Sequence, residues 1–176
     1  ERLEAGLDAT RESPSDAGKL EWIVRRPTQG EREVLEEGEL DLEVGLKGDI
    51  WIHKPSRHTG DGTAHPEMQI TLMNSRVVEL IAGPRDRWAL AGDQFYVDLD
   101  LAEENLPVGA RVELGSAVVE ITAMPHLGCA KFRERFGVDA LRFVNSRQGR
   151  ALRLRGVNAK VVTPGSVRVG DEVRVR

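Results

Sequence analysis

Residues 106–122, LPVGARVELGSAVVEIT, read as two short strands joined by a tight glycine turn. Turn residues in LPVG (106–109) and LGS (114–116) bound two stretches rich in valine, leucine and isoleucine. Similar short segments occur on both sides, as FYVDLDL (95–101), VNAKVVT (157–163) and EVRVR (172–176). Short strands and glycine turns at such close spacing predict a mainly β protein, built as a barrel or a sandwich.

The first half of the chain adds two more strands and a helix. GKLEWIVRRP (18–27) alternates apolar and polar residues until Pro27, and EMQITLMN (67–74) has the β-branched content of a central strand. Between them, IHKPSRHTGDGTAHP (52–66) predicts a loop because it is rich in Pro, Gly, Ser and Thr. Ser75 is expected to cap a helix over 76–82 that Gly83 ends.

One helical insertion interrupts the strands of the second half. CAKFRERF (129–136) places Phe132 and Phe136 four residues apart, on one face of a predicted helix that Gly137 ends. DALRFVNS (139–146) predicts a second short helix directly after it.

Length and composition indicate one cytoplasmic domain. A chain of 176 residues suits a single core, so we expect an N-terminal arm over 1–18, which is polar, and one domain over 19–176. No apolar run is long enough for a membrane span, and ERLEAGLDAT (1–10) lacks the features of a signal peptide. The single cysteine, Cys129, excludes an internal disulfide, as is usual in a reducing compartment.

Positive charge is concentrated around that cysteine. The net charge is −4, yet residues 122–160 carry 9 basic and 2 acidic side chains, a local balance of +7. A basic segment in an acidic protein suggests an anionic small molecule as partner, and neither nucleic acid nor membrane. The alternative is that these arginines only lie on solvent-exposed faces of helices and bind no ligand.

Cys129 is the strongest candidate for chemistry. A helix that begins at this residue would bring free backbone N–H groups near its sulfur, and Lys131 and Arg133 would also favour the thiolate. Thiolates attack electrophiles, carry persulfide sulfur or bind soft metals. The alternative is a cysteine buried in the core as a small apolar residue.

Other catalytic patterns find little support. His126 and Cys129 form an H-x-x-C pair, but His53, His58 and His65 are too irregularly spaced for a structural zinc site. The sequence has no Ser-His-Asp order, no Walker loop and no dinucleotide-binding glycine pattern.

The order of several segments resembles the MOSC domain, the module at the C-terminus of molybdenum cofactor sulfurases. The resemblance runs from about Leu20 to the end of the chain, and its segments are IVRRP, GLKGD, EMQITLMN, LPVGARVELGSAVVEIT, GCAKF and RLRGVNAKVVT. It implies a MOSC-type β-barrel of mixed or antiparallel strands with a few short helices. It also implies the molybdenum cofactor (molybdopterin) as ligand, whereas no pyridoxal phosphate is expected.

By this resemblance Cys129 is the catalytic residue, and the metal ligand if molybdenum is bound. Guanidinium groups pair well with the phosphate of such a cofactor, and amide or hydroxyl groups add neutral hydrogen bonds. The expected cofactor-binding residues are His126, Lys131, Arg142, Asn145, Ser146, Arg153, Arg155 and Asn158, with Asp49 and His58 from the loop region.

Two functions follow from the resemblance and the thiol. The first is an enzyme, either a molybdenum-cofactor-dependent oxidoreductase or a sulfur transferase, in which Cys129 ligates molybdenum or carries a persulfide. The second is a non-catalytic binding or sulfur-carrier module that passes an anionic small molecule to a partner protein. A protein partner for sulfur or electron transfer is possible in either case.

Overall fold

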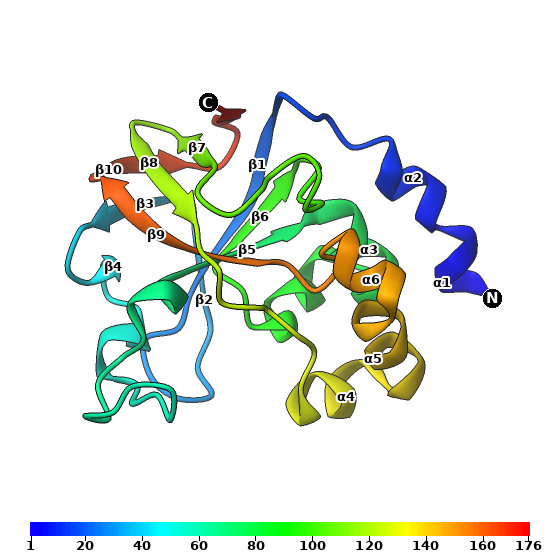
Figure 1. The fold of residues 1–176 in the computed structure, drawn as a ribbon, viewed down its shortest axis with the longest axis horizontal. Helices are drawn as coiled ribbons and strands as arrows, with labels where there is room; N and C mark the ends of the chain where they lie inside the picture. The colour runs from blue at the N-terminus through cyan, green and yellow to red at the C-terminus, as the bar shows by residue number, and fades with distance from the viewer.

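Seven strands close into a mixed barrel in the computed structural model, which describes residues 1–176 (Figure 1). Only β5 and β6 are parallel neighbours, and the other neighbouring strands are antiparallel. Around the barrel the strands are β1 (Ala17–Arg25), β6 (Phe95–Asp98), β5 (Ile70–Asn74), β9 (Val157–Thr163), β8 (Ala117–Ile121), β7 (Arg111–Leu114) and β11 (Glu172–Val175). The predicted β-barrel is confirmed, and residues 106–122 supply its β7–β8 hairpin.

Strand β1 closes the barrel because it pairs with different neighbours along its length. Its first residues, from Ala17 to Lys19, pair with β11, and residues from Lys19 to Ile23 pair with β6. Its last residues extend beyond the barrel and pair with β2 (Glu33–Leu35). A separate small sheet contains β3 (Glu37–Asp41), β4 (Gly45–Leu46) and β10 (Gly165–Arg168).

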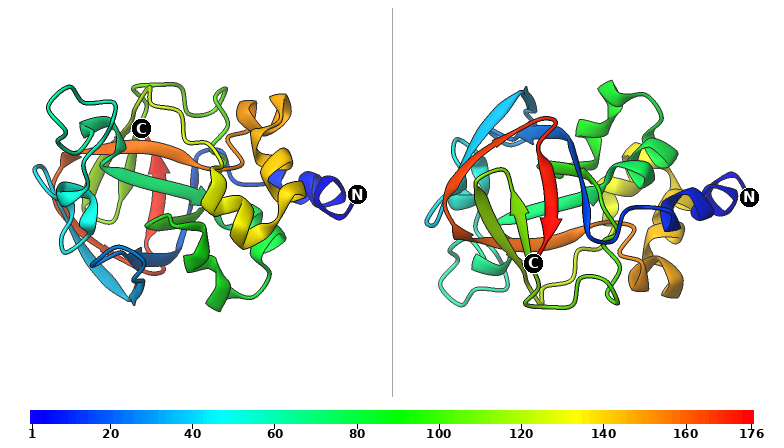
Figure 2. Two further views of the ribbon diagram at one scale, coloured as in Figure 1. Left: turned by 90° about the horizontal axis from the view of Figure 1, so that it is seen from below. Right: turned by 90° about the horizontal axis from the view of Figure 1, so that it is seen from above.

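The helices gather at one side of the barrel, as Figures 1 and 2 show. This layer contains α3 (Ser75–Ala82), the 3-10 helix η3 (Arg85–Ala91), α4 (Ala130–Phe136), α5 (Val138–Asn145) and α6 (Arg147–Ala151). Two shorter 3-10 helices, η1 (Ile50–His53) and η2 (Pro66–Met68), flank the predicted glycine-rich loop. None of the helices combines the length and the apolar content that a membrane crossing requires.

Two hydrophobic cores follow from this arrangement. One fills the barrel with 21 buried residues, among them Leu20, Leu72 and Val119. The other has 14 buried residues and joins the barrel wall to the helices, with Met73 and Tyr96 packed in one cluster with Phe132 of α4. The second core therefore fixes α4, and with it Cys129, against the barrel.

Two local expectations need correction. Asn74, and not Ser75, caps α3, because Asn74 has extended backbone angles and its side chain accepts the Arg76 N–H. The strand predicted over 95–101 ends at Asp98.

The first 16 residues contain α1 (Arg2–Ala5) and α2 (Leu7–Arg11). These residues contact the helical layer, since Leu7 is buried and Arg2 donates a hydrogen bond to the Leu80 carbonyl. The division of the chain into an arm and one domain stays a prediction.

Candidate functional site

Cys129 stands immediately before α4, as its N-cap residue, with an extended backbone. Its side chain is free and exposed. Three residues later, Phe132 is buried in the second core and anchors the first turn of the helix. The alternative of a cysteine buried in the core is therefore wrong, and the predicted position at a helix start is confirmed.

The surroundings lower the pKa of the Cys129 thiol below its ordinary value. Partial burial opposes ionisation, but the backbone N–H groups of Phe132 and Lys131 and the charges of Arg155 and Arg135 outweigh it. The sequence predicts the charge effect from the side chains of Lys131 and Arg133. In the structure the charge effect comes from Arg155, in the turn before β9, and from Arg135, in a later turn of α4.

Asn145 fixes the backbone just before the cysteine. Its side-chain oxygen accepts the Gly128 N–H at 2.8 Å, and its side-chain nitrogen donates to the Gly128 carbonyl at 3.0 Å. A Cβ atom at position 128 would lie 2.8 Å from Leu141 and 3.0 Å from Val144. A larger residue there would require Leu141 and Val144 to shift, so α5 constrains the backbone from which Cys129 begins α4.

A buried carboxylate organises the other side of the site. Asp93 is fully buried and accepts hydrogen bonds from Arg155, also buried, and from His126 Nε2 at 2.6 Å. Burial alone would raise the pKa of Asp93, but Arg155 and His126 lower it to about 2, so the carboxylate is ionised at neutral pH. The Arg155 guanidinium lies 5.1 Å from the centre of the Phe132 ring, which connects this ion pair to the cysteine helix.

His126 serves this carboxylate as a neutral imidazole. Its burial and the charge of Arg155 lower its pKa, and the ionised Asp93 requires the imidazole proton on Nε2. No three His, Cys, Asp or Glu side chains are grouped so as to hold a metal ion. An H-x-x-C zinc pair thus has no further protein ligands.

Four arginines donate to four consecutive backbone carbonyls at the end of η3. Arg32 bonds to Ala89 at 3.2 Å, Arg135 to Leu90 at 2.8 Å, Arg155 to Ala91 at 2.7 Å and Arg26 to Gly92 at 3.3 Å. Partial desolvation lowers the pKa of Lys54, and the nearby charges of Arg26, Lys131 and Arg32 lower it further. Sequence reasoning missed Arg26, Arg32 and Arg135 as site residues, because their segments meet only in the folded chain, whereas Lys54 is expected from the sequence to cover the ligand together with His58.

The loop residue Asp49 is buried and forms a two-pronged ion pair with Arg26, with Oδ2 at 2.8 Å from Nη2. Its Oδ2 also accepts the Trp51 N–H and so caps η1. These contacts hold the start of the glycine-rich loop. His58 is exposed within that loop, and Lys131 is exposed on α4.

Several other predicted site residues have local partners. Arg142 is exposed and faces Asp139 at 3.9 Å, Ser146 caps α6, and Arg153 donates to the Leu101 and Leu106 carbonyls. Asn158 is buried and donates to the Met124 carbonyl at 3.1 Å, whereas its oxygen has no partner. The charge argument therefore depends on Arg155, and a role of Arg142, Ser146 or Arg153 in ligand binding stays a prediction.

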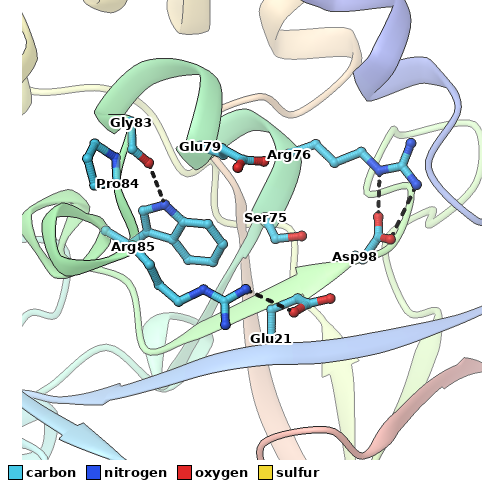
Figure 3. A pocket seen from close by; sticks show the side chains of 9 residues that line it. Glu21, Ser75, Arg76, Glu79, Gly83, Pro84, Arg85 and Asp98 are labelled. Atoms are coloured by element: carbon cyan, nitrogen blue, oxygen red, sulfur yellow. Dashed lines mark hydrogen bonds and ion pairs between the residues drawn. The ribbon is translucent and has the colours of Figure 1, made fainter.

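A cavity of about 470 Å³ lies elsewhere, between α3, η3, β1 and β6 (Figure 3). Its walls carry the ion pairs Arg85–Glu21 and Arg76–Asp98, and none of the predicted site residues lines it. Its polar groups are thus largely paired with one another, and we base no functional assignment on it.

Fold and site together define a small mixed β-barrel protein with an exposed thiol, whose pKa is lowered, at the start of a helical insertion. The family model for the MOSC domain matches residues 60–174. The chain belongs to the MOSC domain family, which is linked to molybdenum cofactor binding. No curated protein matches the chain.

Solved structures support the fold. The YuaD protein from Bacillus subtilis superposes with a TM-score of 0.69 at 20% sequence identity, over 90% of this chain and 95% of that one. YiiM from Escherichia coli gives a TM-score of 0.56 at 17% identity, over 90% of this chain and 69% of that one. YiiM from Geobacillus stearothermophilus gives 0.58 at 13% identity, over 90% and 75%.

Proposed function

We propose that this protein binds the molybdenum cofactor and uses Cys129 either to ligate molybdenum or to carry sulfur to it. The observation that carries the proposal is the exposed Cys129 thiol, whose pKa is lowered at the start of α4 beside Arg155 and Arg135. Membership of the MOSC family supports the molybdenum cofactor as the ligand, and the chemistry of the donor groups agrees with it.

The residues present fit such a ligand. A thiolate is a suitable soft donor for molybdenum, and guanidinium and ammonium groups suit a phosphate ester. Buried Arg155 Nε and Asn158 Oδ1 have no hydrogen-bond partner in the protein, so both have bonding capacity left for a guest. When bound, molybdenum would supply the two-electron redox chemistry that the side chains themselves lack.

Within this proposal each group has a defined task. Cys129 provides the sulfur, and the first-turn N–H groups of α4 favour its ionised form by lowering its pKa. Lys131 binds the anionic part of the ligand, Arg155 adds positive charge beside Cys129, and Asn145 keeps Cys129 in place through Gly128. Asp49 caps η1 at the start of the loop that carries His58, and this loop is proposed to cover the ligand.

Sulfur carriage is the second candidate, and the exposure of the thiol favours it. Leu127, two residues before Cys129, is 41% exposed, so the surface beside the sulfur is open to a partner protein. In this reaction the Cys129 thiolate takes the outer sulfur of a donor persulfide and releases the donor as a thiolate. Incubation with a low-molecular-weight persulfide followed by mass spectrometry would detect one added sulfur atom on Cys129.

The proposal is tested by the metal and pterin content of the protein made in cells that synthesise the cofactor. We expect molybdenum and pterin to copurify with the wild type, and Cys129→Ala to lose molybdenum. Absence of both from the wild type and the variant would defeat cofactor binding. A persulfide on the wild type without molybdenum would favour the carrier function.

A further inference from the structure

Two arginines that no sequence motif identified converge above the Gly92 backbone. A Cβ atom built on Gly92 would lie 3.8 Å from Arg32 Nη2 and also 3.8 Å from Arg135 Nη1. The two guanidinium groups are therefore neighbours, although they come from the segment after β1 and from α4. Burial lowers the pKa of Arg32, and the charge of the nearby Arg135 lowers it further.

Neutral groups hold this pair in place. Arg32 donates to the Ala89 and Glu31 carbonyls at 3.2 Å and 2.8 Å, and Arg135 donates to the Leu90 carbonyl at 2.8 Å. Neither guanidinium forms a salt bridge with a carboxylate. The nearby acids are already engaged, because Asp49 pairs with Arg26 and Asp93 pairs with Arg155.

This arrangement has a physical consequence. A carbonyl fixes the direction of a guanidinium without neutralising its charge, whereas a carboxylate would do both. Two adjacent positive charges repel each other, and this repulsion is relieved when an anion binds between them. Both side chains are only partly buried, so an anion from solution can reach them.

We propose that Arg32 and Arg135 form a paired-guanidinium site for a phosphate-like oxyanion above Gly92. This site deepens the proposed function. It rests on that function in one respect, namely that the ligand bound near Cys129 is an anion. It adds two residues that would contact the charged part of that ligand, and it lies near the thiol because Arg135 also contributes to the field at Cys129.

Titration calorimetry of the full chain with inorganic pyrophosphate at low ionic strength tests this site. Arg32→Gln and Arg135→Gln should each weaken binding about fivefold or more, as expected for the loss of one charge-assisted contact. Arg133→Gln is the matched control. It removes the same charge from the same helix, but two residues along a helix point about 200° apart, so its effect should stay below about twofold.

The alternatives are distinguishable. If Arg133→Gln and Arg135→Gln weaken pyrophosphate binding equally, the attraction is unspecific and the proposed site is wrong. The site is also wrong if Arg135→Gln binds pyrophosphate as tightly as the wild type, or if the wild type does not bind it at all. Thermal unfolding of each variant excludes misfolding, and Arg32→Gln tests the same site from outside α4. If the expected pattern appears but no molybdenum or pterin copurifies, the proposed function fails and the anion site stands.

Discussion

The buried carboxylate of Asp93 forms an ion pair with the buried guanidinium of Arg155. This pair joins the loop before β6 to the turn before β9, and Arg155 in turn lies over the Phe132 ring of the cysteine helix. The ion pair therefore contributes to the stability of the second core and also to the electrostatic environment of Cys129.

Removal of Asp93 should destabilise the fold strongly. Asp93→Ala leaves Arg155 buried without its counter-charge, which typically costs about 3 to 5 kcal/mol. Chemical denaturation measures this loss. The exposed Asp139, which faces Arg142 at 3.9 Å, serves as control, and Asp139→Ala should change the free energy of unfolding very little. Equal effects of the two substitutions would contradict the structural role of Asp93.

The Asp93 carboxylate should also make the free energy of unfolding depend on pH in the acidic range. Asp93 has a pKa of about 2 in the folded protein against an ordinary value of 3.8, so the folded state holds fewer protons. Its contribution, about 2 kcal/mol, is fully present above pH 3.8 and is lost as the pH falls toward 2. His126 has a lowered pKa as well, so stability should begin to fall once the pH drops below 6.5, where the unfolded chain takes up a proton.

Denaturation curves at a series of pH values from 7 to 2.5 test this dependence. Asp93→Asn should show a shallower decline than the wild type between pH 4 and pH 2.5. Parallel curves for the two proteins would show that Asp93 is not the group responsible.

Asn145 should act on the thiol through Gly128. Asn145→Ala removes both hydrogen bonds to the Gly128 backbone, so Cys129 should lose its fixed position relative to the N–H groups of α4. We expect a higher pH midpoint for alkylation of Cys129, together with a stability loss of about 1 to 2 kcal/mol. The two readouts come from alkylation kinetics and chemical denaturation.

Asn105 offers a matched control for that experiment. Its side-chain nitrogen also donates to two carbonyls, those of Ser15 and Asp100, both at 2.8 Å. Asn105→Ala should cost comparable stability and leave the alkylation midpoint unchanged. A shift in the midpoint for both variants would reduce Asn145 to a structural role.

Much of the barrel was predictable from sequence, because short strands and glycine turns are local signals. The β7–β8 hairpin over residues 111–121 and the helix start at Cys129 are examples. The closure of the barrel by β1 was not predictable, since its partner β11 lies about 150 residues away in sequence and no local pattern encodes their pairing.

The site was predictable only in part, for the same reason. A count of arginines over 122–160 treats Arg153 and Arg155 alike, yet Arg153 turns to the Leu101 and Leu106 carbonyls while Arg155 pairs with Asp93. Arg32 and Asp93 lie outside that segment altogether. They join the site through backbone carbonyls and a buried carboxylate, which leave no motif in the sequence.

The most direct test of the account is the pH dependence of iodoacetamide alkylation, because Cys129 is the only thiol in the chain. The folded protein should react without denaturant, with a midpoint below that of the same protein unfolded in denaturant. Arg135→Gln should move the folded midpoint upward. A midpoint at or above the unfolded value, or reaction only after unfolding, would contradict the claim that Cys129 is a functional thiolate.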